Sequence, residues 1–134
     1  MIKRTNLKDY DLTNPQSTAD AIAAILSERK GKDVTVVDLG DKTIIADYFV
    51  IASANSTTAV KALADNVEDE FSKMGIEPLH RDVDGKWVAL DYGSVIVHIF
   101  YTELREFYNI ERLWADGANL QKFDEQAEDL VANS

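Results

Sequence analysis

Residues 47–75 read DYFVIASANSTTAVKALADNVEDEFSKMG and join two segments of different periodicity. The first six residues are an almost uninterrupted apolar run, which is typical of a strand covered on both faces. Over residues 60–74, apolar side chains recur at spacings of three and four with charged residues between them, which predicts an amphipathic helix. Asn55 or Ser56 can cap its start, and Gly75 can end it. A strand that leads into a long helix indicates an α/β domain.

The segments on either side continue this alternation of strands and helices. Apolar periodicity and turn residues predict, in chain order, a helix opened by Ser17 with Asp20 completing a capping box, a strand over 33–39, a hairpin of 76–81 and 86–90 joined through Asp84-Gly85, a strand over 94–101, and a helix that Thr102 caps and that ends at Trp114. We expect one α/β domain in which a mixed sheet of about five strands is flanked by helices.

The chain divides into three parts. Its 134 residues fit a single domain with one hydrophobic core. Residues 1–16 have weak periodicity and end at Asn14-Pro15, so we expect a flexible N-terminal arm. Residues 17–117 form the predicted domain. Residues 118–134 form an acidic C-terminal tail, in which we expect residues 119–134 to form a poorly docked helix.

The composition excludes several classes of protein. The chain has no cysteine, which excludes disulfides, thiolate metal sites and a cysteine nucleophile. No apolar run approaches the roughly 18 residues of a membrane span, and we expect a cytoplasmic protein without membrane contact. Lys and Arg number 14 against 24 Asp and Glu, giving a net charge of −10. Nucleic-acid phosphates repel such a chain and basic proteins attract it. This predicts a basic protein partner and no direct sequence-specific binding of nucleic acid.

The sequence assembles no complete catalytic or cofactor site. Its six glycines stand singly rather than in a phosphate-binding loop, and its two histidines, His80 and His98, fall on different predicted strands. We therefore predict no catalytic residue, no cofactor and no metal. Asp82 and Asp84 form an Asp-x-Asp pair, as nucleotidyltransferases use to hold magnesium. The Gly-Ser turn of those enzymes precedes the carboxylates, whereas here it follows them, and Asp is common beside hairpin turns.

Aromatic residues gather in the C-terminal half of the predicted domain. Trp87, Tyr92 and His98 each combine an apolar body with a polar atom, so interface and core are equally compatible with them. Large apolar side chains are more often buried than exposed. We therefore predict core positions for Phe49, Ile51, Val97 and Phe107.

Five short stretches follow one another in a recognisable order: ADYFVIAS at 46–53, WVALDYG at 87–93, VHIF at 97–100, REFY at 105–108 and ERLWAD at 111–116. Together they resemble the Iojap family, the ribosomal silencing factors, over about residues 17–117. Several separate matches in the same order make the resemblance specific.

The resemblance implies a domain related to the nucleotidyltransferase fold but without its catalytic residues. It also implies binding to the large (50S) ribosomal subunit through ribosomal protein uL14, which would block joining of the small subunit and restrain translation under nutrient limitation. The resemblance further implies that the free protein forms a homodimer. The family's contact surface carries over to Trp87, Leu90, Asp91 and Tyr92, with His98, Phe100, Arg105 and Tyr108 as further members. A nucleotidyltransferase-like enzyme and a large-subunit assembly factor are the alternatives.

Overall fold

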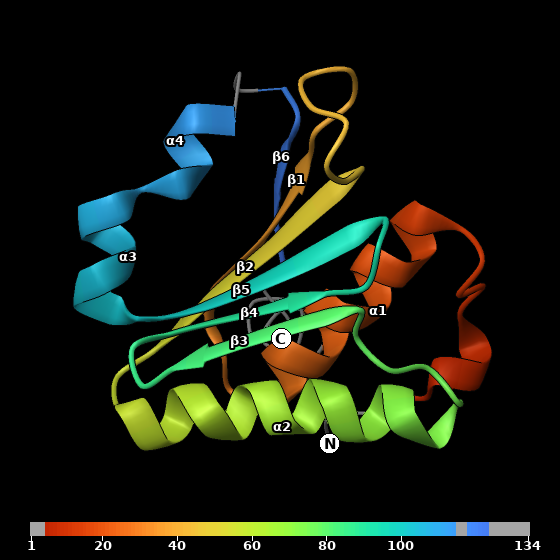
Figure 1. Ribbon diagram of the computed structural model, residues 1–134, viewed down its shortest axis with the longest axis horizontal. Coiled ribbons are helices and arrows are strands. Elements are labelled where there is room, and N and C mark those ends of the chain that lie inside the picture. The colour runs from red at the N-terminus through yellow and green to blue at the C-terminus, as the bar shows by residue number, and fades with distance from the viewer. Residues whose placement is uncertain (1–4, 115–117, 124–134) are drawn as a thin grey trace, which may run out of the picture.

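Six strands form one mixed sheet in the computed structural model, which describes residues 5–114 and 118–123 (Figure 1). The strand order is β3-β4-β5-β2-β1-β6; β2 and β5 are parallel, and the other neighbouring strands are antiparallel. In chain order the elements are the 3-10 helix η1 (Leu7–Asp9), α1 (Pro15–Glu28), β1 (Lys32–Asp38), β2 (Tyr48–Ala54), α2 (Thr57–Lys73), β3 (His80–Asp84), β4 (Trp87–Asp91), β5 (Val95–Tyr101), α3 (Thr102–Tyr108), α4 (Ile110–Trp114) and β6 (Leu120–Lys122).

The predicted α/β class and mixed sheet are confirmed, with six strands rather than about five. The additional strand is β6, which pairs with β1 through Thr35↔Lys122 and Val37↔Leu120. The helix expected from residue 119 is therefore wrong for Leu120–Lys122. A three-residue strand held by backbone pairing leaves no periodic pattern in the sequence. The rest of that predicted helix, residues 124–134, lies outside the described residues.

The helix predicted after the apolar strand is confirmed as α2. The Ser56 side chain accepts a hydrogen bond from the backbone N–H of Ala59 at 3.0 Å, which satisfies a donor of the first turn. At the other end, Met74 is the C-cap and Gly75 has a φ of +78°, a conformation that glycine adopts without strain. The apolar stripe of α2 is buried through Val60, Leu63, Ala64, Val67 and Phe71.

Helix α1 begins three residues earlier than predicted, because its N-cap is Asn14 rather than Ser17. Asn14 caps it by accepting a hydrogen bond from the backbone N–H of Ser17 at 2.9 Å, and Pro15 occupies the first turn, where its missing N–H has no cost. The side chain of Leu7 is buried in the core. The described part of the expected N-terminal arm thus packs against the domain.

Two predicted boundaries in the C-terminal half are also wrong. The first hairpin strand is β3, not residues 76–81, and its turn is Gly85-Lys86; Asp84 precedes this turn and accepts a hydrogen bond from the backbone N–H of Lys86 at 3.2 Å. The single helix expected up to Trp114 is two helices, because Asn109 adopts a left-handed backbone with φ of +47°. Thr102 is the first residue of α3 rather than its cap, and its hydroxyl donates to the backbone oxygen of Ala54 at 3.0 Å.

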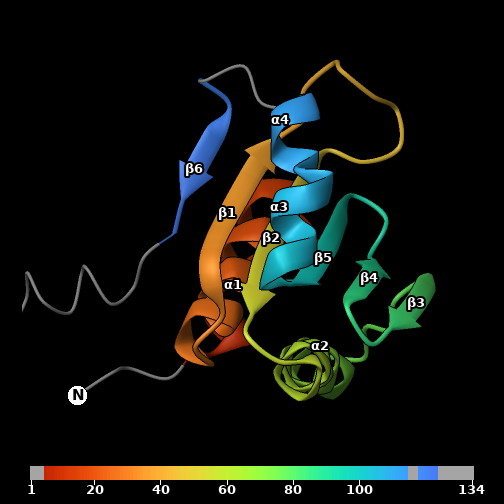
Figure 2. The ribbon, with the colours of Figure 1, turned by 90° about the vertical axis from the view of Figure 1, so that its left-hand side faces the viewer.

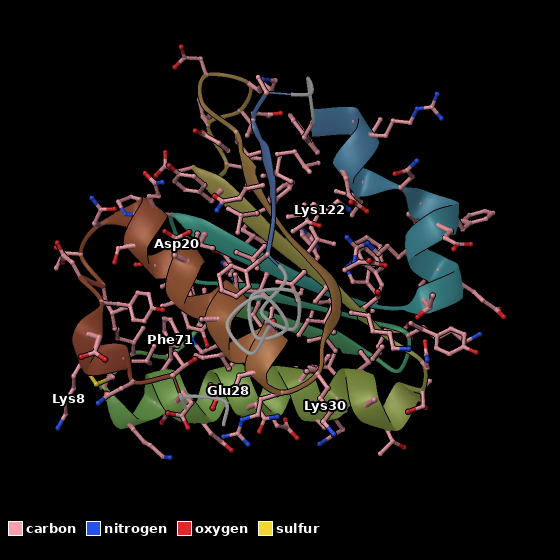
Figure 3. All side chains as sticks on the ribbon, turned by 180° about the vertical axis from the view of Figure 1, so that it is seen from behind. Lys8, Asp20, Glu28, Lys30, Phe71 and Lys122 are labelled. Carbon is pink, nitrogen blue, oxygen red and sulfur yellow. The ribbon has the colours of Figure 1, made fainter. Side chains whose placement is uncertain are left out.

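Helices cover the two sides of the sheet unequally. On one side, here called the α2 face, α1 and α2 bury the larger core, which includes Phe71, Leu90 and Val97 (Figure 3). On the other side, the α3 face, a smaller core includes Phe49 and Phe100, and α3 and α4 lie in front of the sheet in Figure 2 while α1 lies behind it. No helix in the described part of the chain is long and apolar enough to cross a membrane.

Candidate protein interface

The eight predicted contact residues do not form one patch, because strand alternation sends their side chains to opposite faces of the sheet. Trp87 lies opposite Phe100 in the β4–β5 ladder, and Leu90 lies opposite Val97. Leu90 is completely buried under the α2 face, so it adds nothing to the surface that the free domain presents. Trp87 and Phe100 belong to the α3 face.

Tyr92 also belongs to the α2 face. Its ring packs against that of Phe71 of α2 with 4.8 Å between the centroids. Its hydroxyl oxygen is buried without a hydrogen-bond partner among the described residues. Burial, with a smaller contribution from the negative charges of Glu68 and Glu77, raises the pKa of Tyr92. The Tyr92 side chain therefore mainly packs against the core under the α2 face.

On the α3 face, Trp87 is the centre of an aromatic cluster. Its indole N–H donates to Nδ1 of His98 at 3.2 Å, and its ring lies 4.9 Å from Phe100 and 5.2 Å from Tyr108, centroid to centroid. Phe100 and His98 are buried, Trp87 is half-buried and Tyr108 is exposed. Phe100 and His98 thus support the cluster from within, and Trp87 and Tyr108 present it to solvent.

The buried His98 side chain accepts the Trp87 hydrogen bond as a neutral imidazole. Burial lowers the pKa of His98 to about 4, because desolvation disfavours the charged form. Nδ1 then carries a lone pair at neutral pH and can accept the indole proton. The hydrogen bond fixes the plane of the Trp87 ring at the surface.

Asp91 is half-buried at the end of β4 and shapes the turn that follows. Its Oδ1 accepts a hydrogen bond from the backbone N–H of Gly93 at 2.7 Å. Gly93 has a φ of +88°, which a side chain at that position would strain. Asp91 is thus a turn residue in this structure.

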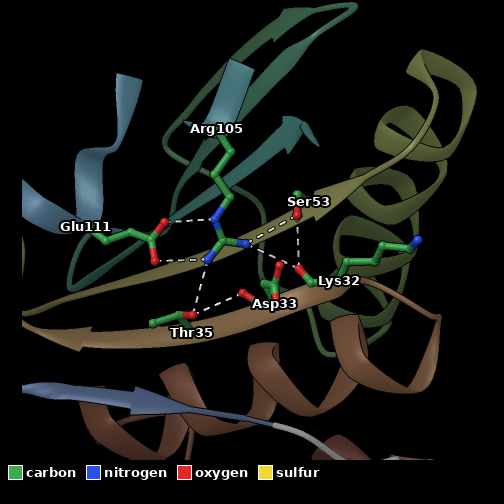
Figure 4. Close-up of polar contacts among 6 residues, drawn as sticks. All are labelled: Lys32, Asp33, Thr35, Ser53, Arg105 and Glu111. Atoms are coloured by element: carbon green, nitrogen blue, oxygen red, sulfur yellow. Dashed lines mark hydrogen bonds and ion pairs between the residues drawn. The ribbon is translucent and has the colours of Figure 1, made fainter. Parts of the chain in front are cut away.

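Arg105, also predicted as a contact residue, is buried, and its guanidinium group is bonded within the domain. Its Nε and Nη2 donate to the two carboxylate oxygens of Glu111 at 2.8 and 3.1 Å (Figure 4). The remaining N–H groups reach the backbone oxygen of Lys32 and the hydroxyls of Ser53 and Thr35 at 3.2 to 3.3 Å. All five guanidinium donors therefore have partners, and the network ties α3 and α4 to β1 and β2.

The ion pair with Arg105 also lowers the pKa of Glu111. Hydrogen bonds from Arg105 hold the pKa of Glu111 below its ordinary value, because they favour the ionised carboxylate. Sequence reasoning missed this pair, since the two residues lie six positions apart across the break at Asn109. A continuous helix would place partners three or four positions apart.

An exposed apolar surface, also missed, lies on the two helices that this network holds. Phe107 is 79% exposed and Leu113 is 76% exposed, so the predicted core position of Phe107 is wrong. Phe49, Ile51 and Val97 are buried as predicted. We call the exposed residues Phe107, Tyr108 and Leu113 the α3–α4 ridge. Ile44 and Ile45, in the connection between β1 and β2, are exposed as well. Contiguous exposed apolar side chains, as where Phe107 contacts Tyr108 with 5.2 Å between ring centroids, are typical of binding surfaces.

The Asp-x-Asp pair of the alternative enzyme hypothesis lies on β3. Register places Asp82 opposite Ala89 and Asp84 opposite Trp87, so both carboxylates point to the α3 face, and both residues are exposed. The described residues contain no group of three or more His, Cys, Asp or Glu side chains that could hold a metal ion. His80 and His98 lie on β3 and β5, which are not neighbouring strands.

Comparisons with known proteins identify the family. A family model described as "Ribosomal silencing factor during starvation" matches residues 12–133. The ribosomal silencing factor RsfS of Bacillus subtilis is 32% identical over 105 residues, which are 77% of this chain and 89% of that protein. The mouse protein "Mitochondrial assembly of ribosomal large subunit protein 1" is 28% identical over 121 residues, 86% of this chain and 51% of that protein.

A solved structure gives the same answer for the fold. A crystal structure of a Chromobacterium violaceum protein matches with a TM-score of 0.72 and 30% identity, covering 75% of this chain and 86% of that one. The resemblance noted in the sequence is thereby confirmed. The chain belongs to the ribosomal silencing factor family.

Proposed function

We propose that this protein binds the large ribosomal subunit through the basic ribosomal protein uL14 and sterically prevents association of the small subunit. It would thereby repress translation in the cytoplasm under nutrient limitation, without catalysis. The observation that carries the proposal is the family match over residues 12–133, nearly the whole chain. Blocking by occupancy requires only a body with a binding face, which a single domain of 134 residues can supply.

The α3 face is the binding face that the geometry favours. It presents Trp87 in contact with Tyr108, and Tyr108 in contact with the exposed Phe107. Leu113 of α4 is exposed as well. Partly exposed aromatic residues on a rigid base are the side chains that concentrate binding energy in protein interfaces. The α2 face is instead covered by α1 and α2, so it has less apolar surface to offer.

The net charge supports a basic partner. A charge of −10 accelerates encounter with a cationic protein, and this effect weakens as salt screens it. Charges at the rim of an interface chiefly change the association rate, and buried aromatic contacts chiefly change the dissociation rate. We therefore expect salt to slow the association of this protein with the large subunit more than it speeds dissociation.

Co-sedimentation with separated ribosomal subunits tests the proposal. We expect the purified protein to travel with large subunits through a sucrose gradient and not with small subunits, at low and at moderate salt. Cross-linking of the bound protein should then recover uL14 as the major partner. Migration at the top of the gradient with both subunits, or a main cross-link to another ribosomal protein, would contradict the proposed contact.

The second candidate function is assembly of the large subunit. It is favoured by the name of the mouse relative, which refers to large-subunit assembly. An assembly factor would use the same surface but bind precursors of the large subunit. Pull-down from growing cells separates the two functions, since enrichment of immature particles over mature large subunits indicates assembly, and the reverse indicates silencing.

A further inference from the structure

A groove on the α3 face lies between the β3–β4 hairpin and α3. It is lined by two carboxylates, two aromatic rings and two aliphatic side chains, namely Asp82, Asp84, Trp87, Ala89, Leu104 and Tyr108. β3 forms the outer edge of the sheet here (Figure 1), so the groove opens beside a strand whose residues are all exposed.

Strand register explains how these side chains come together. Asp82 pairs with Ala89, and Asp84 pairs with Trp87, and directly opposed residues in an antiparallel ladder project to the same face. Ala89 has the shortest side chain of this group, which leaves room above β4. Tyr108 of α3 forms the opposite wall, with its ring centroid 5.2 Å from that of Trp87.

The two carboxylates of the groove have no cationic partner among residues 5–114 and 118–123. Neither Asp82 nor Asp84 forms an ion pair with any residue that the structure describes. Arg81, which precedes Asp82 in β3, lies opposite Leu90 on the α2 face and pairs with Glu68. The groove is therefore negatively charged.

The aromatic wall is rigid. The hydrogen bond from the Trp87 indole to His98 and the ring contact with the buried Phe100 hold the indole in place. A fixed aromatic face beside unpaired carboxylates suits a planar cation, because a guanidinium stacks on an aromatic ring and donates to carboxylates through the same plane. An ammonium group is a compact point charge and uses this arrangement less fully.

We propose that this groove receives an arginine side chain of the basic partner protein. The guanidinium lies against the Trp87 ring and donates hydrogen bonds to Asp82 and Asp84, while Leu104 and Tyr108 cover the aliphatic part of the side chain. The inference rests on the proposed function for the source of the arginine, and it deepens that function by naming the chemistry of one contact.

A peptide titration tests the groove without the ribosome. The full chain, labelled with nitrogen-15, is titrated with acetyl-Gly-Arg-Gly-amide and with the matched citrulline peptide, which is neutral but similar in shape. The chain has two tryptophans, so the indole N–H signal of Trp114 is an internal reference for that of Trp87. We expect the arginine peptide to move the Trp87 signal, and the citrulline peptide and the D82N/D84N variant to show little change. Equal responses to both peptides, or an unchanged response of the variant, would overturn the proposal.

A binding measurement with isolated large subunits forms the second arm. We expect D82N/D84N to weaken binding about tenfold, the scale of one desolvated cation contact, and to reduce the salt dependence. The control D41N/D69N removes the same charge from two exposed positions outside the groove and should bind like the parent. Equal affinity of D82N/D84N and the parent would overturn the groove assignment. Failure of the parent itself to bind would instead overturn the proposed function, and the peptide arm would still decide the groove.

Discussion

The indole N–H of Trp87 on β4 donates to Nδ1 of His98 on β5 at 3.2 Å, so a buried imidazole orients an aromatic ring at the surface. The two rings lie 5.9 Å apart between centroids. Protonation of His98 would remove the acceptor and place a charge in a buried position. The geometry of the α3 face is therefore coupled to the neutral state of one histidine.

This coupling predicts an acid-sensitive stability. Because the pKa of His98 is about 4 in the folded protein and about 6.5 in the unfolded chain, the unfolded state binds the proton first as pH falls. The contribution of His98 is therefore complete above pH 6.5 and is lost as pH falls toward 4. We expect about 2 kcal/mol less unfolding free energy at pH 5 than at pH 7.5 from this group.

Urea unfolding at several pH values measures this contribution. The His98→Gln variant keeps a polar side chain that does not titrate, so the difference between parent and variant isolates the histidine from the carboxylates. Parallel pH profiles for the two proteins would show that His98 is not the titrating group.

Two substitutions of Asp91 distinguish its role in the turn from the role of its charge. Asparagine keeps an oxygen that can accept from the Gly93 N–H, whereas alanine does not. We expect Asp91→Asn to melt like the parent and Asp91→Ala to lose about 1 kcal/mol, the scale of one hydrogen bond. If Asp91 also pairs with a cation of the partner, Asp91→Asn will raise the dissociation constant for the large subunit. A large loss of stability in Asp91→Asn would restrict Asp91 to the turn.

The Arg105–Glu111 pair predicts a large effect on stability. Removing Glu111 leaves the buried Arg105 without its anionic partner, which typically costs up to about 3–5 kcal/mol. Removing Arg105 leaves the half-buried Glu111 unpaired, and partial solvation reduces the cost of that charge. We expect Arg105→Met and Glu111→Gln each to destabilise the fold, with the arginine variant affected more because it also abandons Ser53, Thr35 and Lys32.

Arg105→Lys serves as the matched variant for this prediction. It keeps the charge but loses the fork that reaches four partners, so it should recover only a minor part of the stability. Denaturant unfolding gives the free energies. Full recovery by lysine would mean that charge alone, rather than the hydrogen-bond geometry, holds α3 and α4.

The α3–α4 ridge predicts how the free protein self-associates. Exposed Phe107 and Leu113 give two copies an apolar surface to bury, and we expect a homodimer in the absence of ribosomes. The F107S/L113S variant should shift the equilibrium to monomer in analytical ultracentrifugation, with a change in unfolding free energy below about 0.5 kcal/mol. Leu79→Ser, an exposed position outside the ridge, is the control. A dimer that survives F107S/L113S, or one that Leu79→Ser disrupts equally, would place the contact elsewhere.

The helix and strand pattern could be predicted wherever periodicity was strong. The apolar strand and the stripe of α2 each follow from local sequence, and Ser56 and Gly75 mark the helix ends by their own chemistry. β6 could not be predicted in this way, because its three residues pair with β1 through the backbone and their side chains show no pattern.

The candidate interface was predicted less completely than the fold. Strand alternation contains the information that Leu90 and Trp87 point to opposite faces, but the resemblance supplied contact positions without a face. The exposure of Phe107 was beyond local prediction, because it depends on how the Arg105 network holds α3 against two strands distant in sequence. Residues placed by such long-range contacts have no signature in their own neighbourhood.

Reassociation of ribosomal subunits tests the central claim most directly. Large and small subunits are mixed with a saturating amount of the protein, under conditions that otherwise join them, and are separated on a sucrose gradient. The account predicts that joined ribosomes decrease, that the protein sediments with the large subunit, and that Trp87→Ala requires about thirtyfold more protein for the same effect, as loss of an anchor worth about 2 kcal/mol implies. Met74→Ala, on the exposed end of α2, should act like the parent. Undiminished joining of the subunits at saturation would contradict the account.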